Sequence, residues 1–211
     1  MKKTPDQVQN SQGIEQKLLE RIKLCKLPPL QRRSLPFECY WEDSILIQEQ
    51  KLIFSNQWLG LGRADRLETP GEYEVFELCG QALVLIRDQD NILRLYANTC
   101  RHRGAKLLDG TGQCQAISCP FHGWTYTLDG NLKYAKTMSE NPNFDFSEHS
   151  LIEYKLKELQ GFLFAFLGNQ PTDLDSQLGD FSELHQPWSL NELITTRREV
   201  FEVQCNWKAF L

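Results

Sequence analysis

Two short fragments, each holding a cysteine and a histidine, constrain the fold and chemistry of this chain more than any other feature. "CRHRG" places Cys100 and His102 with one residue between them, and "CPFHGW" places Cys119 and His122 with two. Sixteen residues separate His102 from Cys119, enough for one excursion and return of the backbone. Because thiolates and imidazoles are common ligands of zinc and iron, the pattern predicts two similar loops that present four donors to a metal centre.

The order of the ligand types bears on which metal binds. A structural zinc ion accepts two cysteines and two histidines tetrahedrally, so a Cys2His2 zinc site is one interpretation. Common zinc fingers, however, offer a cysteine pair and then a histidine pair, whereas each fragment here offers one of each. Alternation favours a binuclear iron centre, in which one iron binds both thiolates and the other binds both imidazoles. The zinc site remains an alternative, as do two core cysteines beside incidental histidines.

The two fragments lie within a long stretch of short β-type runs. Each run is bounded by turn residues, and "LDGN" carries the Asp129-Gly130 pair that favours a two-residue hairpin turn. Short strands at this spacing predict an antiparallel sandwich or barrel over roughly residues 62–168. The Cys–His fragments fall in its loops, where ligands converge without disturbing strand hydrogen bonds. The predicted strands are "EYEVFEL", "ALVLIR", "ILRLYA", "WTYTL", "NLKYA", "EYKLKEL" and "GFLFAFL".

Helices are expected before the β-rich stretch. Apolar residues at helical spacing predict an amphipathic helix over residues 14–22, which Pro28 and Pro29 terminate. A second helix is expected from Asp43, a candidate N-cap, to near Trp58, where two glycines follow. The predicted fold class is therefore mainly β with flanking helices (α+β), an antiparallel β-sandwich with N-terminal helices.

Changes in sequence texture divide the chain into three segments. Residues 1–58 form the expected N-terminal helical segment, residues 59–168 the β domain with the metal centre, and residues 169–211 a linker and the truncated start of a further domain. The last segment ends in a strand candidate, "REVFEVQCNWKAFL", over residues 198–211. Its pattern stops without a turn or a polar tail.

Charge and hydropathy exclude some classes of function. The net charge of −5 and the pI near 5.5, with Lys and Arg spread along the chain, argue against a nucleic-acid partner. A signal peptide requires an apolar stretch, and none follows residues 1–13. The longest apolar runs are far shorter than the roughly 20 residues that span a bilayer. We therefore expect a cytoplasmic protein without membrane contact, whose seven cysteines bind metal or fill the core rather than form a disulfide framework.

The two Cys–His fragments together resemble the Rieske [2Fe-2S] motif, in the form found in ring-hydroxylating and related Rieske non-haem iron oxygenases. The resemblance implies that Cys100 and Cys119 bind one iron and that His102 and His122 bind the other through ring nitrogens. It also implies a Rieske-type sandwich around a one-electron centre. The potential of such a centre lies above that of all-cysteine clusters, because imidazole is neutral where thiolate is negative.

The respiratory members of that family carry a disulfide between the two loops, and this chain departs from them. Ala105 and Phe121 stand at the corresponding positions, which indicates the oxygenase and ferredoxin branch. Without that brace the loops need other packing, for which Trp124 and Pro120 are the candidates. The arginines on both sides of His102 have two interpretations that stay open, solvated loop charge and docking of an acidic redox partner.

The flanking segments extend the resemblance to the large terminal subunit of these oxygenases, over roughly residues 33–211. "RRSLP" and "FSNQWLGLGRAD" precede the β domain, and Asn206, Trp207 and Lys208 match the triplet that opens the family's catalytic domain. The resemblance implies a mono- or dioxygenase that relays electrons to a mononuclear Fe(II) for O2-dependent hydroxylation of an organic substrate. A reductase or ferredoxin would supply the electrons from NAD(P)H. The resemblance also implies a homotrimer for the full-length protein.

The mononuclear iron needs two histidines and a carboxylate, which in the family follow the Asn-Trp-Lys triplet. The chain ends shortly after that triplet, and His149 and His185, 36 residues apart in polar segments, are interpreted as surface histidines. We therefore expect an N-terminal portion of an oxygenase subunit that lacks the mononuclear iron and is inactive alone, with a stand-alone Rieske ferredoxin as the alternative. "RRSLP" and "GRAD" are similar to the branch that oxidises quaternary ammonium compounds rather than aromatic acids.

Overall fold

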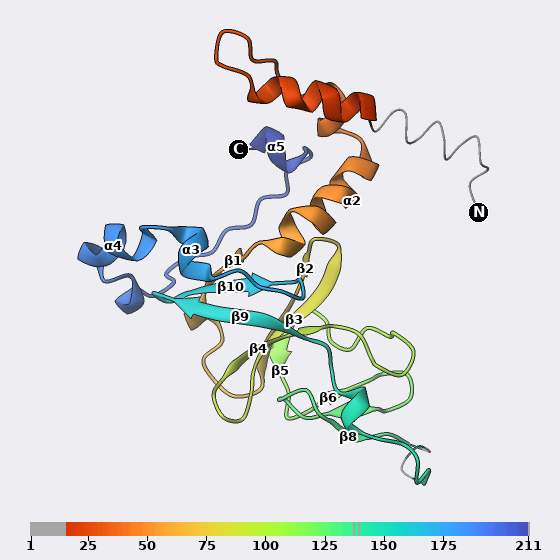
Figure 1. The fold of residues 1–211 in the computed structure, drawn as a ribbon. Helices are drawn as coiled ribbons and strands as arrows, with labels where there is room; N and C mark the ends of the chain where they lie inside the picture. The colour runs from red at the N-terminus through yellow and green to blue at the C-terminus, as the bar shows by residue number, and fades with distance from the viewer. Residues whose placement is uncertain (1–15, 137, 139, 211) are drawn as a thin grey trace, which may run out of the picture. The chain divides into compact units, whose positions relative to one another are not determined.

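The computed structural model describes residues 16–136, 138 and 140–210, and its backbone divides into two compact units (Figure 1). One unit comprises Met1–Glu49 with Val200–Leu211, and the other comprises Gln50–Glu199. The second unit contains every strand found in the described residues, together with both Cys–His fragments. The finer division at residues 58 and 168 stays a prediction.

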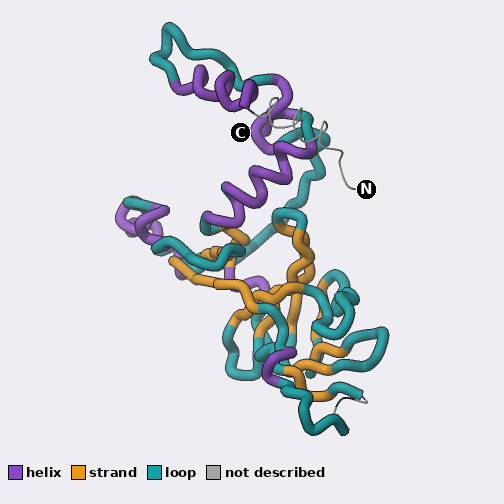
Figure 2. Tube along the Cα trace, turned by 45° about the vertical axis from the view of Figure 1, so that its right-hand side comes forward, coloured by secondary structure: helices purple, strands orange, loops and turns teal. Residues whose placement is uncertain are grey.

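The strands of the second unit form an antiparallel sheet of seven strands and a smaller sheet of three. Their order is β1-β10-β9-β4-β3-β2-β5 in the large sheet and β6-β7-β8 in the small sheet. Figure 2 draws the strands in orange. The fold class, mainly antiparallel β with flanking helices, is therefore confirmed. The strands are β1 (Leu59–Arg63), β2 (Glu72–Leu78), β3 (Gln81–Arg87), β4 (Leu93–Ala97), β5 (Thr111–Gln113), β6 (Ile117–Ser118), β7 (Thr125–Tyr126), β8 (Leu132–Tyr134), β9 (Glu153–Leu159) and β10 (Phe162–Phe166).

Strand β3 is the centre of the hydrophobic core because both of its faces are buried. Leu83 and Leu85 belong to an apolar cluster shared with β10. Val84 and Ile86 alternate to the other face, where they join the cluster that contains Tyr126 of the small sheet. Each of these four aliphatic side chains is fully buried and contributes about 1.5–3 kcal/mol. The cluster that contains Val84 and Ile86 also includes Cys100, Cys119 and Trp124 of the two Cys–His loops.

Strands β7 and β8 form the hairpin that the sequence predicts, but its turn has three residues rather than two. Thr127 donates its N–H to the Asn131 carbonyl (2.9 Å), and Gly130 donates to the Thr127 carbonyl (3.0 Å). Gly130 has a φ of +83°, so the loop is a type I turn followed by a left-handed residue. Side-chain hydrogen bonds from Thr127 and Asn131 to the Asp129 carboxylate close the turn.

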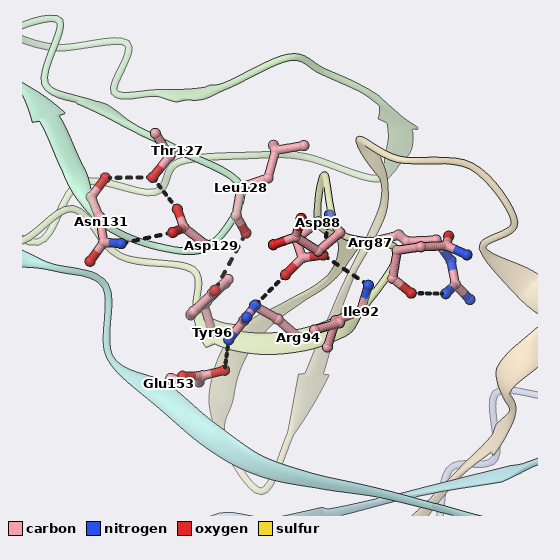
Figure 3. A network of polar contacts seen from close by, with 12 residues as sticks. Arg87, Asp88, Ile92, Arg94, Tyr96, Thr127, Leu128, Asp129, Asn131 and Glu153 are labelled. Carbon is pink, nitrogen blue, oxygen red and sulfur yellow. Dashed lines mark hydrogen bonds and ion pairs between the residues drawn. The ribbon is translucent and has the colours of Figure 1, made fainter.

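A polar network on β4 supports this hairpin from the large sheet (Figure 3). The Tyr96 hydroxyl donates to the Leu128 carbonyl at 3.4 Å. On the same strand, Arg94 bridges Asp88 (2.6 Å) and Glu153 on β9 (3.1 Å). Because the Asp88 carboxylate is buried, its pairing with Arg94 removes the cost of an isolated buried charge.

Helix α2 (Asp43–Leu52) begins at the predicted residue but ends well before Trp58. Ser55 donates its hydroxyl to the Gln50 carbonyl (2.7 Å), and Asn56 donates its amide to the last carbonyls of the helix. These side chains satisfy groups that a further helical turn would otherwise have bonded.

The glycines expected to stop this helix lie in strand β1 instead. Gly60 and Gly62 pair with β10, and the register shifts between them because Gly62 adopts a φ of +96°. Strands β5 and β6 were likewise not predicted, since two or three residues show no usable alternation. The seven runs predicted as strands within the β-rich stretch each contain a strand in the structure.

The predicted strand over residues 198–211 is wrong in its described part, which pairs with no strand of the described residues. Its end forms helix α5 (Trp207–Phe210) instead, and Leu211 lies outside the described residues. Glu49 accepts hydrogen bonds from the Trp207 indole N–H (2.9 Å) and the Lys208 ammonium (2.7 and 2.8 Å). These bonds hold the short helix within the first unit.

The first expected helix is present over residues 16–23, and its predicted start at Ile14 lies outside the described residues. It ends before Pro28, as predicted. No helix in the described parts of the chain is long and apolar enough to cross a membrane. The remaining elements are η1 (Leu24–Lys26), η2 (Phe37–Tyr40), η3 (Phe54–Asn56), η4 (Ala64–Arg66), η5 (Ser147–His149), α3 (Leu174–Leu178), α4 (Phe181–His185), η6 (Gln186–Trp188) and η7 (Leu190–Glu192).

Candidate metal centre

The first Cys–His loop, residues 100–105, is closed by two backbone hydrogen bonds. Cys100 donates its N–H to the Ala105 carbonyl (2.7 Å), and Gly104 donates to the Cys100 carbonyl (2.9 Å). Gly104 has a φ of +70°, a left-handed conformation that costs other residues about 1–2 kcal/mol. His102 branches from the third position of this loop.

The second Cys–His loop, residues 119–124, is closed in the same way. Cys119 donates its N–H to the Trp124 carbonyl (2.8 Å), Gly123 donates to the Cys119 carbonyl (3.1 Å), and the φ of Gly123 is +69°. His122 branches from the fourth position. The different spacing in the two fragments therefore reflects one backbone frame, from which the imidazole branches at two different positions.

The four side chains predicted as ligands converge on one cavity of about 230 Å³. The thiols of Cys100 and Cys119 are buried, with 3% and 4% exposure, whereas His102 is half-buried and His122 is exposed. The two imidazole centroids lie 4.8 Å apart with their planes at 79°. The structure thus brings all four predicted residues together, with the thiols on the inside and the imidazoles toward the surface.

The chemistry of these groups fits a cationic centre. Burial raises the pKa of the Cys100 thiol, and the neighbouring Cys119 thiol raises it further, a penalty that a thiolate-binding metal reverses. Burial, Arg103 and His122 lower the pKa of His102, which favours the neutral imidazole that metals bind. His102 Nδ1 is buried without a hydrogen-bond partner among the described residues, which costs about 1–3 kcal/mol unless a ligand occupies it.

The arrangement also bears on the number of metal ions. Nowhere in the described residues do three or more His, Cys, Asp or Glu side chains converge on the position of a single ion. A four-coordinate zinc requires four donors around one point. Two thiols at one end of the cavity and two imidazoles at the other suit two metal ions with two protein donors each.

Tyr126 is a site residue that the sequence analysis missed. Its hydroxyl accepts the Arg101 backbone N–H at 3.0 Å and lies 3.3 Å from Cys100 Sγ, to which it can donate once the sulfur is a thiolate. Burial, and then the Cys100 thiol, raise the pKa of Tyr126, so the hydroxyl stays protonated. Its position in the sequence could have indicated this role, because side chains two residues apart on a strand point to the same face, and Tyr126 lies two residues after Trp124.

Trp124 supplies the loop packing that the sequence predicts in place of a disulfide. Its indole is buried and stacks on the His102 imidazole, with centroids 4.9 Å apart and planes 13° apart. Pro120, the other candidate, is exposed. Ala105 and Phe121 line the cavity at the positions of the absent disulfide, and Phe121 is 75% exposed.

His149 and His185, interpreted as surface histidines, are half-buried and pack at a tilt against aromatic rings. The His149 ring lies 4.4 Å from Phe144 and 5.6 Å from Trp124. His149 therefore contacts Trp124 beside the site, but it does not line the cavity that the four proposed ligands share.

Arginines flank His102 in the sequence, and Arg103 also lines the cavity. Arg101 and Arg103, on the two sides of His102, are exposed, and both interpretations given for them remain open. All seven cysteines lie in the described residues and have free thiols, as the sequence predicts.

Comparisons with known proteins agree with this site. Residues 57–153 match the family described as "Rieske [2Fe-2S] domain". The oxygenase subunit of carnitine monooxygenase from Acinetobacter pittii is 33% identical over 181 residues, which cover 84% of this chain and 49% of that protein. The oxygenase subunit of glycine betaine monooxygenase from Chromohalobacter salexigens is 29% identical, over 83% of this chain and 39% of that protein.

A solved structure shows the same likeness in three dimensions. The apo form of a quaternary ammonium Rieske monooxygenase superposes with a TM-score of 0.76 at 32% identity, over 83% of this chain and 52% of that chain. The chain spans about half the length of the curated relatives it matches.

Proposed function

We propose, from the membership of residues 57–153 in the Rieske [2Fe-2S] domain family, that this chain is the electron-relaying portion of the terminal subunit of a Rieske non-haem iron oxygenase. One observation carries the proposal: two buried thiols and two outer imidazoles share one cavity. Similarity to oxygenase subunits covers 84% of the chain, well beyond the Rieske domain. The alternative, a stand-alone Rieske ferredoxin, leaves that similarity of the flanking segments unexplained.

In this proposal, Cys100 and Cys119 bind one iron and His102 and His122 bind the other. A [2Fe-2S] group held there supplies a centre that takes up and releases one electron. The protein keeps the thiolate end away from water, because both cysteines belong to the apolar cluster that includes residues of both sheets. It leaves the imidazole end toward the surface, where a redox partner can approach.

The surrounding side chains adjust how readily an electron is accepted. The Tyr126 hydroxyl donates to Cys100 Sγ and so stabilises the additional negative charge of the reduced state, which raises the reduction potential. Trp124 covers one face of the His102 imidazole and excludes water from it. Outer-shell contacts of this kind tune the potential without binding the metal.

The activity of the complete protein is part of the same proposal. Electrons from NAD(P)H, delivered by a reductase or ferredoxin, would pass from the Rieske centre to a mononuclear Fe(II) in a full-length parent and serve O2-dependent hydroxylation. We further propose a homotrimeric, cytoplasmic parent without membrane contact. This chain alone, in the proposal, holds no mononuclear iron site and oxygenates nothing.

The relatives favour one class of substrate. Oxygenase subunits of carnitine and glycine betaine monooxygenases are 33% and 29% identical to this chain. A chlorobenzene dioxygenase subunit is also similar, at 27% identity over 80% of the chain. The higher identity of the former group, together with "RRSLP" and "GRAD", supports monooxygenation of a quaternary ammonium compound over dioxygenation of an aromatic one.

Metal and sulfide analysis tests the proposal. The purified chain is expected to contain about two irons and two sulfides, to absorb visible light, and to be reduced at a potential within roughly −150 to +300 mV. Zinc in place of iron, without visible absorbance, would refute the Rieske centre. A third iron per chain, or hydroxylated product formed by this chain alone, would refute the absence of a mononuclear iron site.

A further inference from the structure

Trp124 lies between the proposed ligand His102 and a short aromatic segment that no motif indicated. Its indole stacks on His102 at 4.9 Å and 13°. It also makes near-perpendicular contacts with Phe144 (5.7 Å, 79°) and His149 (5.6 Å, 71°). Because Trp124 is only 3% exposed, these neighbours, rather than solvent, set the orientation of its ring.

The segment that carries Phe144 and His149 is itself held in place. The two rings lie 4.4 Å apart at 31°, and His149 Nδ1 is hydrogen-bonded to the Asp145 carbonyl at 2.9 Å. The Asp145 carboxylate accepts the Ser147 N–H at 2.8 Å and thereby closes the intervening turn. The His149 ring is therefore fixed by one hydrogen bond and two ring contacts.

We propose that Phe144 and His149 are positioning residues, which act through Trp124 to fix the plane of the His102 imidazole. The inference rests on the proposed function, in which His102 binds iron. The last torsion of a histidine side chain has a broad energy profile, so packing must select the ring orientation. No hydrogen bond at Nδ1 selects it, and the only ring contacts that His102 makes among the described residues are those with Trp124 and His122.

The orientation of the imidazole matters because a ligand nitrogen binds through a lone pair that lies in the ring plane. Rotation of the His102 ring turns that lone pair away from the metal position. A stacked, buried indole resists this rotation only while its own edge is supported. Phe144 and His149 contact the indole and so support His102 indirectly, through Trp124.

His185 provides a matched control, since it has the same local contacts elsewhere in the second unit. It stacks on Phe181 at 4.4 Å and 34°, and its Nδ1 is bonded to the Phe181 carbonyl at 2.7 Å. It also contacts a tryptophan, Trp188, at 5.8 Å. None of these three residues lines the cavity of the Cys–His loops. Replacement of His185 removes the same kinds of contact without touching Trp124.

The test uses the 211-residue chain with its iron and sulfide, in three variants: His149→Leu, His149→Phe and His185→Leu. We expect His149→Leu to change the g values of the reduced centre in electron paramagnetic resonance and to release iron to a chelator about tenfold faster. His149→Phe keeps a ring and is expected to retain the wild-type spectrum and release rate. His185→Leu is expected to behave as wild type.

Three outcomes overturn the positioning role: an unchanged His149→Leu, a His149→Phe as altered as His149→Leu, or a His185→Leu altered to the same extent. The last outcome would indicate a general loss of stability. A wild-type chain that binds no iron and sulfide would instead overturn the proposed function. A wild-type chain with a Rieske spectrum and an unchanged His149→Leu would overturn the positioning role alone.

Discussion

The two Cys–His loops use one backbone frame and differ in what they add to it. Both are closed by the same pair of hydrogen bonds around a glycine with a φ near +70°. In the first loop the imidazole branches from the third position and the closing residue is Ala105. In the second it branches from the fourth position and the closing residue is Trp124. The asymmetry of the centre thus arises from side chains and not from the course of the chain.

Support between the loops runs mostly in one direction. The second loop contributes Trp124, on which His102 stacks, and leads directly to Tyr126, whose hydroxyl bonds Cys100. From the first loop, the second receives chiefly the edge contact between His102 and His122. A pair of loops without a disulfide is therefore braced by aromatic residues that belong to the second loop and the strand after it.

The largest expected effect tests whether both loops are needed. Cys119→Ala is expected to reduce the iron content from about two per chain to almost none, because thiolates of a [2Fe-2S] centre have no substitute. Cys39→Ala provides the control, since Cys39 and Cys119 are each 4% exposed. Iron and sulfide are measured after reconstitution. Retention of the centre in Cys119→Ala would show that the second loop is dispensable.

The shared frame is tested by Gly104→Ala and Gly123→Ala. Each is expected to lower the free energy of unfolding by about 1–2 kcal/mol, since alanine disfavours a left-handed φ. The two costs should agree within about 0.5 kcal/mol, because neither new Cβ meets a heavy atom within 4 Å. Gly60→Ala, in β1 without a positive φ, is the control. Urea unfolding measures all three, and clearly unequal costs would contradict the common frame.

The one-sided support is tested by Tyr126→Phe, which removes the hydroxyl near Cys100 and little else. We expect the reduction potential to fall by roughly 60 mV, the equivalent of a tenfold change in a one-electron equilibrium. Tyr96→Phe is the control, because Tyr96 is equally buried but bonds a backbone carbonyl. Potentiometric titration distinguishes them. Equal shifts in both variants would rule out a specific hydrogen bond to sulfur.

The smallest effect is expected from the charges that only the first loop carries. Arg101→Gln and Arg103→Gln should change the free energy of unfolding by less than about 0.5 kcal/mol and leave the iron content unchanged, because both side chains are exposed. Their rates of reduction by an acidic ferredoxin, measured at two salt concentrations, then separate the two open interpretations. A slower, less salt-dependent rate indicates docking, and an unchanged rate indicates solvated charge.

The sequence was sufficient where turn residues or donor spacing gave a strong signal. The bounds of β2 and β9 agree with the predicted runs, because a turn that contains a glycine, Gly80 or Gly161, follows each strand directly. The four proposed ligands were found together because two similar fragments that each pair a thiol with an imidazole are typical of a metal centre. Strand β1 was missed, since Gly60 and Gly62 resemble helix breakers and only pairing with β10 makes them a strand.

Other parts of the site depend on contacts between distant residues, which no local pattern reveals. Nothing around His149 indicates that it reaches Trp124, because the contact is made only when the loop after β8 folds back. Tyr126 has an ordinary strand environment until Cys100 is placed beside it. The segment before Trp207 has the composition of a strand but finds no partner edge among the described strands.

The close fit of Gly130 against Tyr96 has a consequence for how this sequence can diverge. A Cβ at position 130 would stand 2.7 Å from the Tyr96 ring. The two positions are therefore coupled: a side chain at 130 can be accommodated only if the ring at 96 becomes smaller or moves. Substitution at 130 alone is therefore disfavoured, and descendants that keep the tyrosine should keep the glycine.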